Sequence, residues 1–326
     1  MHVKGIDLAG LSLLLLLGQS ICWSANTEPG SLLKRVTLIR LDVAGGRIIC
    51  PSLSNAASRS FSTEEGGSQE VLTINPTSDE PSLNYRWQSA ERRFVLELHG
   101  DGSLDLCDTQ AAESIVVEQR SHAPLKVCIE RPGLPKQELR AKSLWHLLVL
   151  HPEVRSCLLP RLSLLAPNWH LGSQVREIEE LLAEEIDPSW RQRRAEWDAC
   201  IKKMQAADFK SRQAADKQLR AGGPVVAAYL QSLDRAAMEP EQQRRIARIL
   251  ESLGRQVDTP ATVAAAWCYD TQVWSARLQH EDAQIRQRAS DHLADLLDRP
   301  LSYDPQADGK TRLRQARVLE ETLLRR

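Results

Sequence analysis

The side chains that could act in catalysis or bind a metal are scattered through this sequence, and none has the spacing of a common catalytic motif. No GxSxG, HExxH, GxGxxG or P-loop pattern occurs, so the usual nucleophile, zinc and phosphate sites lack their spacing. His146 and His151 lie at i and i+5 in LWHLLVLH, and this separation does not place two imidazoles on one helix face. We interpret both as core or surface histidines, and we predict no catalytic residue, no metal and no cofactor.

The segment HGDGSLD comes nearest to a calcium-binding loop. Asp101, Ser103 and Asp105 alternate as the first oxygen ligands of such a loop do, but Leu106 and Ala112 stand where Gly and Glu are needed. The same segment separates FVLELH from LDLC, which are two runs with the composition of strands. We therefore predict that HGDGS forms the turn of a β-hairpin.

Residues 1–25 predict an export signal. One lysine in MHVK precedes the apolar run LAGLSLLLLLG, and the small or polar residues Ser20, Ser24 and Ala25 follow it. The apolar run has the length of about 7 to 15 residues that is typical of such signals, and it is shorter than the roughly 20 residues of a membrane span. We predict cleavage near Ala25 and a periplasmic or secreted protein; an uncleaved anchor at residues 8–23 is the alternative.

The export signal decides how the cysteines are interpreted. None of the seven cysteines forms a CxxC pair, so zinc binding and dithiol redox chemistry have no motif. An oxidising compartment permits disulfides, and Cys107 with Cys128 is the first pair to test, because both lie on predicted strands. Isolated buried thiols are the favoured interpretation of the cysteines beyond the signal. These are Cys50, Cys107, Cys128, Cys157, Cys200 and Cys268.

Length and charge limit the class of protein. A chain of 326 residues with 42% hydrophobic residues is long enough for about two domains with buried cores. Its 42 Lys and Arg residues against 43 Asp and Glu residues leave no net field to attract nucleic acid or an anionic membrane. We predict no nucleic-acid partner, and a membrane contact only if the N-terminal segment stays uncleaved.

Residues 26–142 predict an antiparallel β domain. In FVLELH, the apolar Phe94, Leu96 and Leu98 alternate with other residues, which indicates one strongly apolar face. The stretch at 51–69 is rich in Ser, Glu and Gly, and we expect a mobile loop there. The segments with strand composition are VTLIRLDV, RIIC, VLTI, LNYRWQ, FVLELH, SLDLC, SIVVEQ and LKVCIE.

The rest of the chain predicts helices. Residues 143–172 indicate a connector of two or three short helices that are broken by Pro152, Pro160 and Pro167. Residues 173–326 predict an all-α domain, in which apolar stripes at helical spacing alternate with capping residues and with Gly and Pro. The fold class predicted for the chain is therefore α+β.

Three of the predicted helices share a recurring pattern, R-x-x-A-x-x-x-L. Two copies are complete, and a middle copy matches only the first half. The arginines recur at about 30 to 45 residues, which is the range of two-helix solenoid repeats. We expect the alanine to allow close helix approach, the leucine to fill the groove between hairpins, and the arginine to stay at the margin with its stem packed. The residues are Arg212, Ala215 and Leu219, then Arg244 and Ala247, then Arg286, Ala289 and Leu293.

These segments resemble the HEAT-like helical repeats of many exported bacterial proteins. The resemblance covers about Ala206 to Leu297 and is best in FKSRQAADKQLRAGGPVVAAYLQSLD and IRQRASDHLADLL. The family implies stacked helical hairpins that serve as binding scaffolds, with no catalytic residues to transfer. A compact helical bundle is the alternative arrangement, because bundles follow the same packing rules.

Three functions follow from this organisation. The favoured one is an exported, non-enzymatic scaffold that binds a protein partner through a short HEAT-like helical surface. The first alternative is a regulatory or signalling protein of the envelope that is tethered by its N-terminal segment. The second is an envelope hydrolase with a site between the two domains, which requires a polar pocket with a perturbed carboxylate or histidine.

Overall fold

The structure, a computed structural model, describes most of the chain. The described residues are 29–30, 32–33, 36, 39–53, 58–76, 80–121, 123–166, 169–184, 189–233, 238–253 and 257–324. The predicted export signal lies outside these residues, and its cleavage stays a prediction. No helix among the described residues is both long and apolar enough to cross a bilayer.

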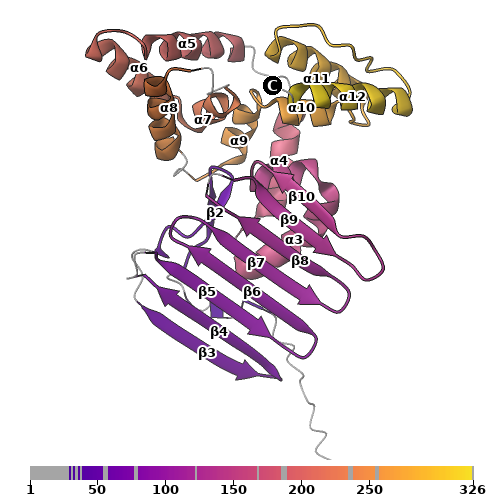
Figure 1. Cartoon of the computed structure of the whole chain (residues 1–326). Coiled ribbons are helices and arrows are strands. Elements are labelled where there is room, and N and C mark those ends of the chain that lie inside the picture. Colours follow the sequence, from indigo (N-terminus) through magenta and orange to yellow (C-terminus); the bar gives the residue numbers. More distant parts are fainter. Residues whose placement is uncertain are drawn as a thin grey trace, which may run out of the picture.

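An eight-stranded antiparallel sheet forms the N-terminal half (Figure 1). Its strands lie in sequence order from one edge to the other, so every pair of neighbours is also consecutive in the chain. A separate two-stranded hairpin, β1–β2, precedes this sheet. The strands are β1 Asp42–Ala44, β2 Arg47–Ile49, β3 Arg59–Glu65, β4 Ser68–Asn75, β5 Ser82–Gln88, β6 Arg92–His99, β7 Leu104–Gln110, β8 Ser114–Gln119, β9 Leu125–Glu130 and β10 Gln137–Ala141.

The predicted alternation along FVLELH is confirmed in β6. Phe94, Leu96 and Leu98 are buried on one face, whereas Val95 and Glu97 are half-buried on the other. The predicted hairpin at HGDGS is also observed, because β6 pairs with β7 across this turn and Gly102 has a φ of 79°. The carboxylate of Asp101 accepts a hydrogen bond from the backbone N–H of Ser103 there, which is a turn contact.

Two strands of the sheet were missed by the sequence analysis. The segment predicted as a mobile loop, 51–69, contains all of β3, so the loop prediction is wrong for Arg59–Glu65. This strand is mostly exposed and polar, which is tolerated at the edge of a sheet because an edge strand pairs on one side only. The strand β10 at the other edge is short and half polar for the same reason. Conversely, among the described residues of the predicted strand VTLIRLDV, only Asp42 and Val43 lie in a strand, and Thr37 and Leu38 lie outside the described residues.

Two helices follow the sheet and cover its apolar face. Helix α2 (Leu144–Leu150) begins at Ser143, whose side chain accepts a hydrogen bond from the backbone N–H of His146. Helix α3 (Pro152–Leu165) contains Pro160 in its interior, so the prediction that this proline breaks the helix is wrong. The buried Leu158 and Leu162 flank this proline in α3, and their burial in the core offsets the hydrogen bond that it cannot donate.

Among the described residues of the C-terminal half, the regular elements are all helices, as predicted, and the fold class is α+β. Val257 forms an isolated bridge with Ala44. Helix α6 packs on α8, and α7 packs on α9, so two successive helical hairpins lie side by side. Further contacts of this half join α5 to α6, α6 to α7, α7 to α8, α4 to α9, α10 to α11 and α10 to α12. The helices are α4 Leu171–Ala183, α5 Trp190–Lys203, α6 Phe209–Ala221, α7 Gly223–Ser232, α8 Pro240–Leu253, α9 Pro260–Trp267, α10 Thr271–Arg277, α11 Ala283–Leu296 and α12 Gly309–Leu324.

The buried side chains form two hydrophobic cores. The larger core joins the inner face of the sheet to α2, α3 and α4, and it continues into α9, α10 and α11 through residues such as Trp267 and Trp274. The smaller core lies between α5–α8 and the loop that joins α9 to α10. It is centred on Trp197, Tyr229 and Tyr269, whose rings contact one another. Part of the helical half is therefore packed into the same core as the sheet.

Candidate functional site

The hairpin β1–β2 is fastened to the C-terminal helices through Asp258. Its turn residues Gly45 and Gly46 have positive φ values of 57° and 72°, which present two successive backbone N–H groups to one acceptor. The carboxylate of Asp258 accepts hydrogen bonds from these two amides at 2.9 Å and 2.6 Å. It also accepts one from the Nε1–H of Trp145 at 2.7 Å. We call this contact the Asp258 clamp.

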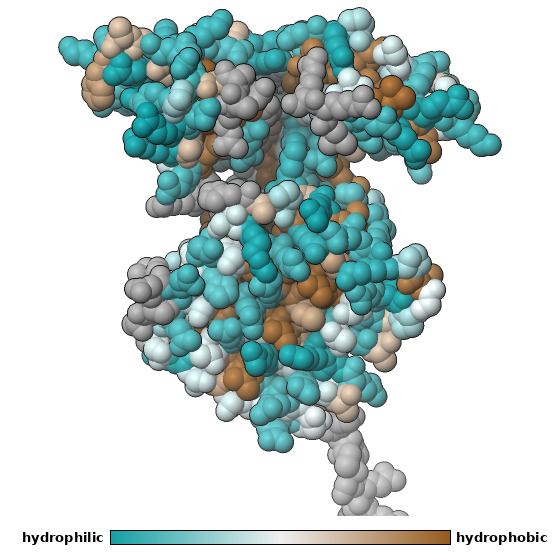
Figure 2. All heavy atoms as spheres, viewed as in Figure 1, coloured by the Kyte–Doolittle hydropathy of each residue, from teal (hydrophilic) through white to brown (hydrophobic). Residues whose placement is uncertain are grey.

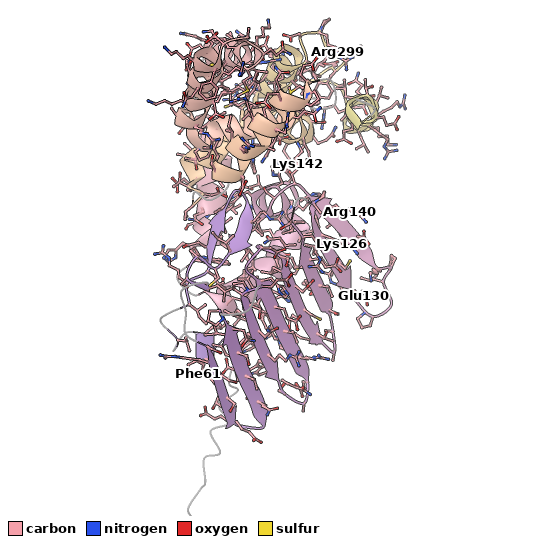
Figure 3. All side chains as sticks on the ribbon, turned by 60° about the vertical axis from the view of Figure 1, so that its left-hand side comes forward. Phe61, Lys126, Glu130, Arg140, Lys142 and Arg299 are labelled. Carbon is pink, nitrogen blue, oxygen red and sulfur yellow. The ribbon has the colours of Figure 1, made fainter. Side chains whose placement is uncertain are left out.

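A second polar cluster lies beside the clamp, where α2 meets the loop between α9 and α10. The Oγ of Ser143 lies 2.7 Å from Nδ1 of His146, and Nε2 of His146 lies 3.1 Å from Oδ2 of Asp270. The Nζ of Lys142 donates to both carboxylate oxygens of Asp270 at 2.9 Å. Figure 3 shows Lys142 at the level where the sheet and the helical half meet. We call these four residues the junction cluster.

The two carboxylates at this junction have opposite pKa shifts. Burial raises the pKa of Asp258, and the hydrogen bonds from Trp145, Gly46 and Gly45 offset this effect only in part. Burial acts in the same direction on Asp270, but the hydrogen bond and charge of His146 and the charge of Lys142 outweigh it. The pKa of Asp270 therefore lies well below its usual range.

The chain of Ser143, His146 and Asp270 has the residue types of a hydrolase triad. Its surroundings favour a structural role, because Ser143 also caps α2 and the imidazole of His146 is only 6% exposed and packs on Trp267. A depression at the β9–β10 turn is lined by none of these residues. Its lining is Ile129, Arg131, Leu134, Pro135, Lys136 and Gln137.

The arginines of the two complete repeat copies bind backbone carbonyls. Nη1 of Arg212 donates to the carbonyl oxygens of Ala206 and Ala207, both at 2.7 Å. Nη1 of Arg286 donates to those of His280 and Glu281, at 2.8 Å and 2.6 Å. In each case the arginine binds the loop that leads into its own helix. An aspartate, Asp208 or Asp282, caps that helix.

The alanines and leucines of these two copies are buried, whereas the middle copy is out of phase. Arg244 and Ala247 are exposed on α8. The buried polar residue of α8 is Gln242, which donates to the carbonyl oxygen of Ile201 at 2.9 Å. A further copy of the arginine contact occurs on α12, where Nη1 of Arg312 donates to the carbonyl oxygen of Ala307 at 2.6 Å. The buried pattern residues are Ala215, Leu219, Ala289 and Leu293.

Cys107 and Cys128, the pair named as a possible disulfide, are not joined in the structure. Cys107 lies on β7 and Cys128 on β9, and both pair with Val116 on the intervening strand β8. Two strand spacings place their Cα atoms about 10 Å apart, which exceeds the range of about 4.4–6.8 Å in disulfides. Both cysteines are free, so the structure does not support this possible pair.

The outward face of the eight-stranded sheet is the largest candidate for binding. Among the described residues, helices cover only the opposite face, and Figure 1 views the strands from the open side with α3 behind them. We call the outward side chains of β3–β10 the open face. Figure 2 shows a band of apolar residues that crosses this face between hydrophilic areas.

Strand register defines three rows across the open face. The apolar row is Val71, Arg86, Val95, Cys107, Val116, Cys128 and Glu138. The first polar row is Thr73, Asn84, Glu97, Asp105, Glu118, Lys126 and Arg140. The second polar row is Gln69, Gln88, Arg93, Thr109, Ser114 and Glu130. Figure 3 labels Lys126, Glu130 and Arg140 near one edge of the sheet and Phe61 on β3 at the other.

Sequence analysis missed the junction and the open face. The glycine pair in AGGR is typical of a turn, but no pattern connects it to Asp258, more than 200 residues later. The outward valines and cysteines alternate with the buried residues along each strand. Their alignment into a row depends on the register between strands, which was not predicted. Comparison with protein-family models, with curated proteins and with solved structures finds no match to this chain.

Proposed function

We propose that this protein is an exported, non-enzymatic scaffold that binds another protein. The observation that carries this proposal is the open face, because a row of valines and cysteines crosses a sheet that no described helix covers on that side. These side chains are half-buried among their polar neighbours, and Cys128 is buried. Polar rows flank the apolar row on both sides. This arrangement of an apolar centre and a polar rim is that of protein interfaces.

The helical half supports the same proposal as a second surface. Its paired hairpins α6–α7 and α8–α9 lie side by side, as expected for the HEAT-like type, and Phe209 at the start of α6 is 60% exposed. The arginine contacts of Arg212 and Arg286 hold the loops between helices to the stack. A scaffold needs such fixed loops, because a rigid surface loses less entropy when it binds.

Site-specific photo-crosslinking tests the proposal and separates the two surfaces. A photoreactive amino acid replaces Val95 on the open face, Phe209 on α6 or Leu134 at the β9–β10 turn, in the full-length protein in its native cells. We expect a discrete crosslinked species from Val95, and none from Leu134, which is about as exposed as Phe209 but lies outside both surfaces. The proposal fails if Val95 and Phe209 give only the diffuse background of Leu134.

A hydrolase with a site between the two domains is the second candidate. The specific observation in its favour is the hydrogen-bonded chain of Ser143, His146 and Asp270 at the junction. A fluorophosphonate probe, which reacts with activated serines, tests it when the labelled peptide is identified by mass spectrometry. Labelling of Ser143 that is lost after mild acid unfolding would favour this candidate, and an unlabelled Ser143 in the folded protein would remove it.

A further inference from the structure

The charges on the open face are arranged so that a second copy of this chain fits it. A twofold axis parallel to the strands, between β7 and β8, would lay two open faces together. Each strand of one copy then faces a strand of the other: β7 faces β8, β6 faces β9, and β5 faces β10. Each residue faces a residue of its own row. The contact area on each copy, its footprint, therefore spans the six strands β5–β10.

The apolar row becomes a self-complementary centre under this axis. Val95 of one copy faces Cys128 of the other, and Cys107 faces Val116. Stacked sheets lie about 10 Å apart, which valine and cysteine side chains fill from both sides. The row ends with Arg86 on β5 and Glu138 on β10, and these two residues also face each other.

The polar rows add two further pairs of opposite charge. Glu97 of one copy faces Lys126 of the other in the first polar row, and Arg93 faces Glu130 in the second. Each pair occurs twice because of the symmetry. Their long side chains can meet even though stacked sheets are rotated by about 30° relative to each other.

Like charges meet near the axis, where Asp105 of each copy faces Glu118 of the other, so this pair also occurs twice. Each of these carboxylates already has a cation in its own chain, because Arg120 lies 2.7 Å from Asp105 and Lys126 lies 3.8 Å from Glu118. The number of strands and of opposite-charge pairs that face each other depends on where the axis lies. Between β6 and β7 it would place Glu97 against Asp105, and no residue of β4–β9 in the three rows would face an opposite charge.

We infer that the partner of the open face is a second copy of this chain, docked face to face about this axis. The inference rests on the proposed function, which assigns binding to the open face. Six strands about 4.8 Å apart and about five residues per strand give a footprint of roughly 500 Å² on each copy. A total of about 1,000 Å² is at the low end of specific interfaces, so we expect a weak dimer in the micromolar range.

Charge reversal provides a test because the symmetry predicts which variants rescue each other. In R93E homodimers two carboxylates would meet at each of the two contacts, and in E130R homodimers two guanidinium groups would meet there. Each variant alone should therefore weaken dimerisation at least about tenfold. In a mixed dimer of R93E with E130R, one contact joins two wild-type residues and the other joins the two reversed ones, so both again pair opposite charges. Sedimentation equilibrium of the mature chain should show monomers for each variant and restored dimers for the equimolar mixture.

The matched control is E64R, a charge reversal on the open face of β3 that lies outside the six-strand footprint. It should dimerise like the wild type, and all variants should retain the circular dichroism spectrum and melting temperature of the wild type. A monomeric wild type at 100 µM, or a mixture that stays monomeric, overturns the inference.

Crosslinking from Val95 separates this failure from that of the proposed function. A species of twice the chain mass, in which Val95 is joined to the β9 peptide that contains Cys128, supports the face-to-face dimer. A crosslink from Val95 to a different protein overturns the dimer but supports the scaffold. If Val95 gives no crosslink at all, the dimer is overturned, and only a crosslink from Phe209 would then support the scaffold.

Discussion

Replacement of Asp258 by alanine should loosen the junction between the hairpin β1–β2 and the helices. The variant removes the acceptor of three N–H groups, and those of Gly46 and Trp145 are buried. A buried donor without a partner costs about 1–3 kcal/mol, which gives about 2–6 kcal/mol for these two. The third donor, the amide of Gly45, is only partly buried and adds little.

The raised pKa of Asp258 places the expected cost in the lower half of this range. A raised pKa means that the three hydrogen bonds do not fully compensate the buried charge, so its removal returns some free energy. We therefore expect Asp258→Ala to lower the free energy of unfolding by about 3 kcal/mol. For a chain of this size this corresponds to a melting temperature lower by about 6 °C.

The dependence on pH has a definite sign. A carboxyl group with a folded-state pKa above its unfolded value of about 3.9 binds its proton more tightly in the folded protein. The wild type therefore gains stability as the pH falls from neutral through the folded pKa toward about 4, whereas the Asp258→Ala variant lacks this gain. The difference between the two proteins should widen in that window.

Urea unfolding at pH 7 and at pH 5, followed by tryptophan fluorescence, measures both quantities. Asp291→Ala is the matched control, because Asp291 is exposed on α11 and accepts a hydrogen bond only from Gln287 among the described contacts. The reasoning is refuted if Asp258→Ala unfolds within about 0.5 kcal/mol of this control. It is also refuted if the difference between wild type and variant narrows on acidification.

Three further results follow from the structure. Asp270→Ala should also destabilise the junction. Because the folded-state pKa of Asp270 is lowered, the loss of unfolding free energy should be constant at neutral pH and shrink only below about pH 4. Urea unfolding between pH 7 and pH 3 measures this loss. Arg286→Ala should cost about 2–4 kcal/mol, because the buried Arg286 makes one buried and two partly buried contacts with carbonyl oxygens. The exposed Arg244→Ala should cost under about 0.5 kcal/mol, and equal costs would contradict the assignment of which arginine faces the core. Peptide mapping without reductant should find Cys107 and Cys128 as free thiols, and a joined peptide would show that the register of β7–β9 is wrong.

The sheet could be predicted where alternation and turn residues occur together. FVLELH, HGDGS and LDLC combined an apolar stripe with a glycine turn, and β6 and β7 form there. The edge strand β3 could not be predicted in this way, because its residues are not buried and therefore carry no apolar pattern. A polar strand is held mainly by its neighbour's backbone, and composition alone does not reveal that neighbour.

The error in the middle repeat has a similar cause. Arg244 was chosen by residue type, but the apolar stripe of Ile246, Ile249 and Leu253 determines which side of α8 is buried. That stripe places Gln242 inside, and a glutamine there makes the contact with the neighbouring helix. The apolar phase of a helix is thus a better guide to its buried face than the recurrence of one charged residue.

The junction could not be predicted, because its partners are distant in the sequence. A local pattern can indicate a turn at Gly45 and Gly46, but nothing in the sequence shows which acceptor these amides will meet. The same holds for His146 and Asp270, which lie on different helical segments. Only the tertiary packing brings these groups together.

The Asp258 clamp also affects which parts of the chain can finish folding while it is still being synthesised on the ribosome. Strands β3–β10 pair with neighbours that have just been synthesised, so this sheet can form early. The turn of β1–β2 has to wait for an acceptor that is made 213 residues after Gly45. A chain whose translation stops before Asp258 would therefore carry a finished sheet with an unsecured N-terminal hairpin, a difference that a protease could recognise.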